Sequence, residues 1–121
     1  MPSPFDASIA AVFWTGRSVG ERSVAEMVNT VKSQAPNVTA ILVKSSDGAH
    51  WQGHYDATSP GLTVTGPDSL AHWVNVAQAA GLAVHAWCVL NGDDIGGEVQ
   101  RVLEACAAPG LKSMLLDVED G

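Results

Sequence analysis

The chain has 121 residues, 46% of them hydrophobic and 16% charged, a balance that is typical of a folded globular domain and argues against disorder. Its 13 acidic and 6 basic residues give a net charge of -7, which repels phosphate backbones and disfavours nucleic acid as a partner. We recognise neither a signal peptide nor a membrane-spanning segment, so we expect no membrane partner and, by default, a cytoplasmic location.

The first half of the sequence alternates apolar runs with an amphipathic segment. Residues 9–14 (IAAVFW) predict a first strand, residues 23–35 a helix that Pro36 ends, and residues 38–44 (VTAILVK) a second strand. The segment 45–66 is rich in glycine and longer than most connections, which predicts a loop with a functional role.

The second half repeats this order. A helix is expected to begin at Pro67 and to end at Gly81, followed by a strand over 82–89 (LAVHAWCV). A third helix precedes Pro109, and the last strand covers 111–118. The residues that we expect the third helix to turn inward are Ile95, Val99, Val102, Leu103 and Cys106.

Strands that are joined by helical crossovers are parallel. We therefore expect one α/β domain over residues 1–121, with four parallel strands in chain order, as in half of an eight-fold β/α barrel. A small doubly wound sheet is the alternative. Cys88 and Cys106 lack metal-type spacing and are interpreted as reduced thiols in the core.

Charged and aromatic residues gather where the predicted strands end. Asp117 and Glu119 alternate at the end of the last strand, so both face one side of the sheet, about 7 Å apart. Ligands bind at the carboxyl ends of parallel strands, which makes these acids the candidate catalytic pair. The candidate substrate-binding residues are Lys44, Asp47, Trp87, His85, Trp51 and Trp14.

A lysine close to two acids helps to keep one of them ionised, while burial favours the neutral form of the other. General acid catalysis on a glycosidic bond needs this arrangement. Plainer explanations exist for each residue: the acids could form a solvated turn, His85 a hydrogen-bonded interior residue, and Trp87 part of the core. No motif in the sequence predicts a cofactor or a metal site.

The segments ILVKSSDG, GLAVHAWCV and MLLDVEDG resemble the first half of glycoside hydrolase family 25 lysozymes and related barrel glycosidases. The resemblance covers residues 38–121 and implies that Glu119 protonates the leaving oxygen, while Asp117 orients and charge-stabilises the sugar. It also implies a polysaccharide or oligosaccharide partner. The first strand departs from the family, because it ends in Trp14 and Thr15 where the family has an acid.

Three functions remain open from the sequence. The first is a glycosidase, completed by a second copy or by a C-terminal half, because a four-stranded parallel sheet exposes its edges. The second is a non-catalytic carbohydrate-binding domain, with aromatic residues stacked on sugar rings. The third is a receiver-like domain that binds a divalent cation through Asp47, Asp117 and Asp120, with strand one placed between strands two and three.

Overall fold

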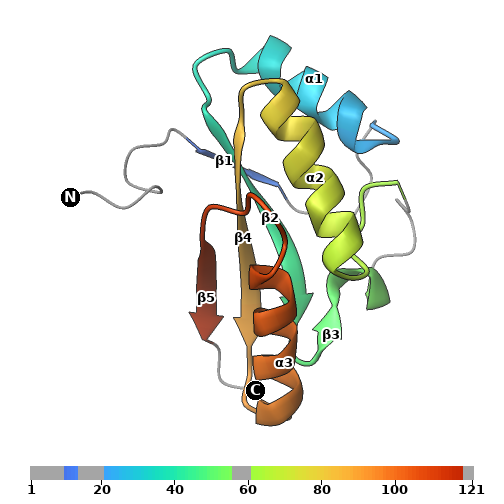
Figure 1. The fold of residues 1–121 in the computed structure, drawn as a ribbon, viewed down its shortest axis with the longest axis vertical. Helices are drawn as coiled ribbons and strands as arrows, with labels where there is room; N and C mark the ends of the chain where they lie inside the picture. The colour runs from blue at the N-terminus through green and yellow to red at the C-terminus, as the bar shows by residue number, and fades with distance from the viewer. Residues whose placement is uncertain (1–9, 14–20, 56–60, 119–121) are drawn as a thin grey trace, which may run out of the picture.

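The computed structural model describes residues 10–13, 21–55 and 61–118, which form an α/β fold (Figure 1). The strands are β1 (Ala10–Phe13), β2 (Ala40–Asp47), β3 (His50–Trp51), β4 (Ala83–Leu90) and β5 (Met114–Val118). The helices are α1 (Val24–Gln34), α2 (Pro67–Ala79) and α3 (Ile95–Cys106), with a short 3-10 turn at Gln52–His54. The predicted alternation of strands and helices is confirmed.

The sheet is mixed. Strands β1, β2, β4 and β5 are neighbours in that order, and each adjacent pair is parallel. The short strand β3 pairs antiparallel with β2, which corrects the prediction of a purely parallel sheet. The two-residue turn between them contains Gly48 at φ 61°, a left-handed conformation that glycine adopts without steric penalty. The prediction of a loop over residues 45–66 is therefore wrong for this hairpin.

The position of β1 distinguishes between the two sheet arrangements considered above. β1 lies beside β2 and is not inserted between β2 and β4. This order differs from the receiver-like one, in which the first strand occupies that central place. The four parallel strands thus follow one another in chain order, with β3 added as a hairpin on β2.

The hydrophobic core lies between the sheet and the helices, which cover one side of it (Figure 1). Helix α1 begins at Ser23, whose hydroxyl accepts a hydrogen bond from the amide of Glu26, and it turns Val24 and Val28 inward. Helix α2 contributes a fully buried tryptophan, Trp73, whose indole N–H donates to the carbonyl of Leu62 over 3.0 Å. These contacts fix α1 and α2 on the sheet.

Helix α3 is turned differently from the prediction. Ile95, Val99 and Leu103 are exposed, as is Cys106, so their expected burial is wrong. The buried residues of α3 are Glu98 and Ala105 instead. The small side chain of Ala105 lets the helix pack closely, and the carboxylate of Glu98 is held by backbone amides. None of the described helices has the length and apolarity to cross a bilayer.

Candidate functional site

A β-bulge in β2 creates the candidate site. Lys44 lies opposite Trp87 of β4, but the next matched pair is Ser46 with Cys88, so Ser45 is an extra residue. Side chains alternate along a strand, and an extra residue reverses the alternation beyond it. The bulge therefore turns Asp47, the last residue of β2, to the same face of the sheet as Lys44.

Lys44 is the buried centre of this site. Its Nζ lies 2.9 Å from Oδ2 of Asp47, a hydrogen-bonded ion pair, and 5.2 Å from the centre of the Trp87 ring. Only 3% of Lys44 is exposed, so its charge is held largely out of water by a carboxylate and an aromatic face. The three residues were predicted as substrate contacts, and the structure brings them together.

Asp117 of β5 lies level with Asp47 of β2, on the same face of the sheet. The register runs from Asp47 to Val89 and from Val89 to Asp117, across the carboxyl ends of three parallel strands. Two strand spacings separate the backbones of the two acids, which is roughly 10 Å. Asp117 is exposed. Glu119, the predicted general acid, and Trp14 lie outside the residues that the structure describes.

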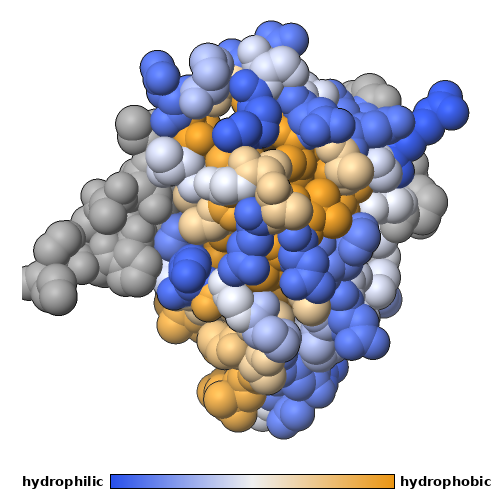
Figure 2. Space-filling model, turned by 45° about the horizontal axis from the view of Figure 1, so that its top comes forward, coloured by the Kyte–Doolittle hydropathy of each residue, from blue (hydrophilic) through white to orange (hydrophobic). Residues whose placement is uncertain are grey.

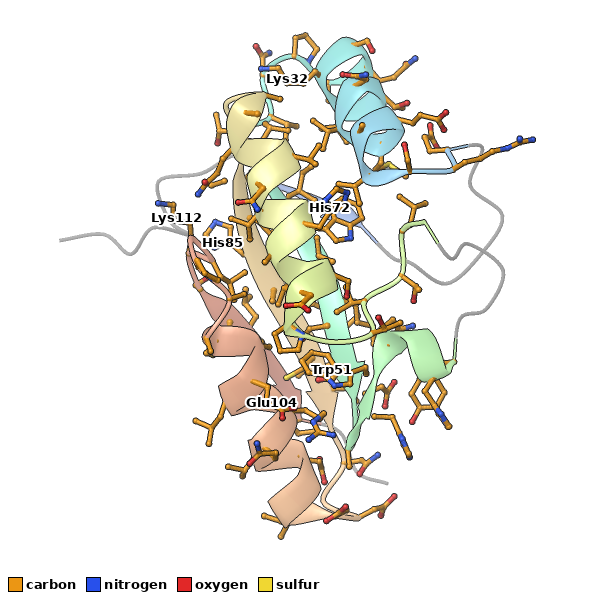
Figure 3. The ribbon with its side chains drawn as sticks, turned by 45° about the vertical axis from the view of Figure 1, so that its right-hand side comes forward. Lys32, Trp51, His72, His85, Glu104 and Lys112 are labelled. Carbon is orange, nitrogen blue, oxygen red and sulfur yellow. The ribbon has the colours of Figure 1, made fainter. Side chains whose placement is uncertain are left out.

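His85 faces the same side but lies two residues before Trp87, further from the carboxyl ends. It is fully buried, and its Nδ1 lies 2.6 Å from the hydroxyl oxygen of Ser113. Burial, followed by the nearby charge of Lys112, lowers the pKa of His85 below its ordinary value. Figure 3 shows His85 and Lys112 near each other. His85 is therefore a neutral, hydrogen-bonded interior residue at pH 7.

Trp51 lies apart from this site. It packs against the core on the helix side (Figure 3). The guanidinium of Arg101 lies 5.8 Å from its ring centre. The guanidinium of Arg101 thus lies over this partly buried ring. The structure does not bring Trp51 together with Lys44 and Trp87, because the two groups face opposite sides of the sheet.

The hairpin adds aromatic residues beside Asp47. His50 and His54 stack with ring centres 4.0 Å apart, and the hydroxyl of Tyr55 donates to the carbonyl of Asp47 over 3.2 Å. Burial and then the charge of Asp47 raise the pKa of Tyr55 above its ordinary value, so this phenol stays protonated at neutral pH. His50 and Tyr55 border a polar cavity of about 300 Å³, which Asn91 and Asp93 also line.

The loop between β4 and α3 is built around Glu98, which the sequence analysis did not single out. Its buried carboxylate accepts hydrogen bonds from the amides of Asn91, Gly92 and Asp94 at 2.8 to 3.2 Å. Asp94 in turn accepts from the amide of Gly97. Asp94 in front of the apolar run is an N-cap signal that the sequence offers, but the acid of a capping box would stand at Gly97, one residue before Glu98.

No group of three metal-ligating side chains occurs in the described part of the chain. Of the three cation ligands that the receiver-like hypothesis requires, Asp47 is paired with Lys44, Asp117 is exposed, and Asp120 lies outside the described residues. The chain matches no protein-family model, and it shows no significant similarity to a curated protein or to a solved structure. The resemblance to family 25 lysozymes thus depends on the three short segments quoted above.

Proposed function

We propose that this chain binds a polysaccharide or oligosaccharide at the face formed by Lys44, Asp47, Trp87 and Asp117, and that Glu119 acts there as a general acid on the glycosidic bond. The observation that supports this proposal is the buried side chain of Lys44, which is paired with the partly exposed Asp47 and lies against Trp87. Removing a charge from water is unfavourable, so a buried lysine at the carboxyl ends of parallel strands is better explained by function than by stability.

The four parallel strands in chain order support a further part of the same proposal, namely that the sheet is the first half of a β/α barrel. In such a barrel, the face that carries Lys44 and Trp87 would line the interior, and the row of Asp47 and Asp117 would lie at its mouth. The remaining wall would be supplied by further chain or by a second molecule.

The chemistry follows from the residue types. As the glycosidic C–O bond breaks, Glu119 donates its proton to the leaving oxygen, and the negative charge of Asp117 stabilises the positive charge on the sugar. A water molecule then adds to the anomeric carbon and returns a proton to a carboxylate. Lys44 and Asp47 would bind sugar hydroxyls, while the apolar surface of Trp87 would pack on the ring.

A non-catalytic carbohydrate-binding domain is the second candidate. The observation that favours it is the exposure of Asp117 together with the lack of an acid at the end of the first predicted strand. A carboxylate in water stabilises a developing charge weakly, because the high dielectric constant screens it. Binding through Lys44 and Trp87 would not require such a carboxylate.

The test measures binding and turnover separately. Tryptophan fluorescence is titrated with oligosaccharides, and the release of reducing ends from cell-wall and soluble polysaccharides is assayed for the wild type, Glu119→Gln, Lys44→Met and the matched control Glu104→Gln on α3. We expect Glu119→Gln to bind but not to cleave, Lys44→Met to bind more weakly, and Glu104→Gln to behave as the wild type.

Each result decides between the candidates. Equal turnover by Glu119→Gln and the wild type would exclude Glu119 from the reaction. Binding without product by the wild type would support the non-catalytic domain. The absence of any fluorescence response and of any product would contradict both candidates.

A further inference from the structure

The polar cavity of about 300 Å³ between the β2–β3 hairpin and the β4–α3 loop has no part in the proposed function. It lies where β2 and β4 end, because the hairpin follows Asp47 and the loop follows Leu90. The amide of Gly48 donates to the carbonyl of Val89 over 2.9 Å, which joins the hairpin to β4. The cavity therefore lies at the edge of the sheet where ligands of parallel α/β folds bind.

The side chains around the cavity are polar and aromatic. His50 and Tyr55 line it from the hairpin, and Asn91, Asp93 and Asp94 line it from the loop. They offer carboxylate oxygens, an amide, an imidazole and a phenol ring. None of the described residues that line the cavity is a lysine or an arginine, so an anion would find two carboxylates and no opposite charge. A neutral ligand rich in hydroxyl groups fits this set, because a hydroxyl both donates and accepts.

The loop side of the cavity is fixed in place before any ligand arrives. The buried carboxylate of Glu98 accepts hydrogen bonds from the amides of Asn91, Gly92 and Asp94, and Oδ1 of Asn91 accepts from the amide of Asp93 over 3.0 Å. Backbone that is already ordered loses less entropy on binding. The carboxylate of Asp93 is exposed, and no lysine or arginine of the described residues forms an ion pair with it.

The hairpin side holds an exposed aromatic ring. Tyr55 is 55% exposed, although its hydroxyl donates to the carbonyl of Asp47 over 3.2 Å. Its ring lies edge-on to that of His54, with ring centres 4.9 Å apart. A ring fixed at the surface in this way can pack on the apolar C–H face of a sugar. Asp47 connects the cavity to the site described above, because its carboxylate pairs with Lys44 while its carbonyl accepts from Tyr55.

The neighbouring groove between α3 and β5 has the opposite chemistry. Figure 2 shows hydrophobic surface at the lower end of the molecule, where these two elements lie. The groove has a volume of about 390 Å³, and aliphatic side chains predominate among the described residues that line it. Glu98 is the one charged residue among them, and backbone amides already bind its carboxylate. The polar cavity is therefore the better match for a sugar.

We propose that the cavity binds a second sugar of the saccharide chain whose first sugar packs on Trp87. Asp93 and Asn91 form hydrogen bonds with its hydroxyls, and Tyr55 packs on its ring. This inference rests on the proposed function and specifies its ligand. The ligand is an oligosaccharide that spans both places, and it is a neutral one, because Asp93 and Asp94 repel sulfated or carboxylated sugars.

The experiment is a titration of the full chain with chito-oligosaccharides and cello-oligosaccharides, from disaccharide to hexasaccharide, monitored by tryptophan fluorescence. We expect the affinity of the wild type to rise with chain length. Asp93→Ala and Tyr55→Ala should each weaken binding of the hexasaccharide about tenfold and change binding of the disaccharide much less. Asp68→Ala makes the same change at an exposed aspartate of α2 and should leave binding unaltered. Circular dichroism verifies that each variant is folded.

A second measurement locates the ligand. The amide NMR signals of Gly48, Asn91 and Gly92 should shift on addition of the hexasaccharide and stay unchanged with the disaccharide. If Lys44→Met weakens binding while Asp93→Ala and Tyr55→Ala bind the hexasaccharide as the wild type does, the proposal for the cavity is overturned and the proposed function stands. If Asp93→Ala and Tyr55→Ala weaken binding and Lys44→Met does not, the cavity is supported and the Lys44 site is not. A wild type that binds none of these saccharides would overturn both.

Discussion

Helices α2 and α3 lie on the same side of the sheet, yet they use their apolar residues in opposite ways. Helix α2 buries Leu70, Trp73 and Val74 completely, as its sequence predicts. Helix α3 has an equally regular apolar stripe, but Ile95, Val99 and Leu103 are exposed. The helix is held by the buried pair Glu98 and Ala105 instead.

The difference shows what an apolar period can and cannot predict. The period identifies a helix and the face that will be covered, but it does not identify the element that covers it. For α2 the cover is the sheet and helix α1 of the same chain. For Ile95, Val99 and Leu103 of α3, the described residues contain no such cover.

The largest effect is expected from a pair of matched leucine substitutions. Leu70→Ala in the core should lower the free energy of unfolding by about 3 kcal/mol, because it leaves a cavity. Leu103→Ala on the exposed stripe should change it by less than about 0.5 kcal/mol in dilute protein. Urea unfolding monitored by tryptophan fluorescence measures both. Equal destabilisation would show that α3 is packed as α2 is.

The next effect concerns the anchor of α3. Glu98→Gln keeps the shape of the side chain but removes the charge that backbone amides donate to, so we expect a loss of about 2 kcal/mol. Glu104→Gln makes the same chemical change at a half-buried surface ion pair with Arg101 and should cost less than about 1 kcal/mol. Urea midpoints compare the two. If Glu98→Gln unfolds at the wild-type midpoint, the carboxylate does not anchor the helix.

The strands and helices with a strong apolar signal could be predicted from the sequence. β2 and β4 contain continuous apolar runs, and α1 and α2 repeat their apolar residues at helical spacing. The hairpin was missed because β3 has two residues, one of them the polar His50, and so carries no alternation. The face of α3 was missed because Glu98 is buried through backbone amides, which no hydrophobic pattern reports.

The sequence could predict which residues belong to the candidate site, but not how all of their side chains are directed. Lys44 and Trp87 were predicted as members of one site where the strands end, and the register places them directly opposite each other. The direction of Asp47 could not be predicted, because it depends on the bulge at Ser45, and bulges arise from hydrogen-bond pairing between strands distant in sequence. The same limit applies to Trp51, whose position beside Arg101 depends on where α3 docks.

A smaller effect is expected from a change of pH on the free energy of unfolding. It should depend on the buried His85 and not on the exposed His72. The pKa of His85 is lowered, so the unfolded chain binds a proton at a higher pH than the folded chain does. The contribution of neutral His85 to stability is complete above the ordinary histidine pKa of 6.5 and is lost as the pH falls below that value.

We expect the wild type to lose more stability than His85→Gln between pH 7.5 and 5.5. Replacing the exposed His72 by Gln should leave the wild-type loss unchanged, and an equal loss in all three proteins would contradict the assignment.

The cysteines give the smallest effect on stability. They also compare the buried strand β4 with the exposed end of α3 most directly. Cys88 is fully buried on β4, and burial, with smaller contributions from neighbouring charges, raises its pKa to about 11. Cys106 is exposed at the end of α3. Because the thiolate is the reactive form, a thiol reagent at pH 8 should modify one cysteine per folded chain rapidly and the second only on unfolding.

Cys106→Ser should remove the rapid phase without shifting the urea midpoint, whereas Cys88→Ser should leave the rapid phase intact. Two rapid phases in the wild type would mean that β4 is as accessible as the end of α3, and the contrast between the covered and the uncovered region would then be wrong.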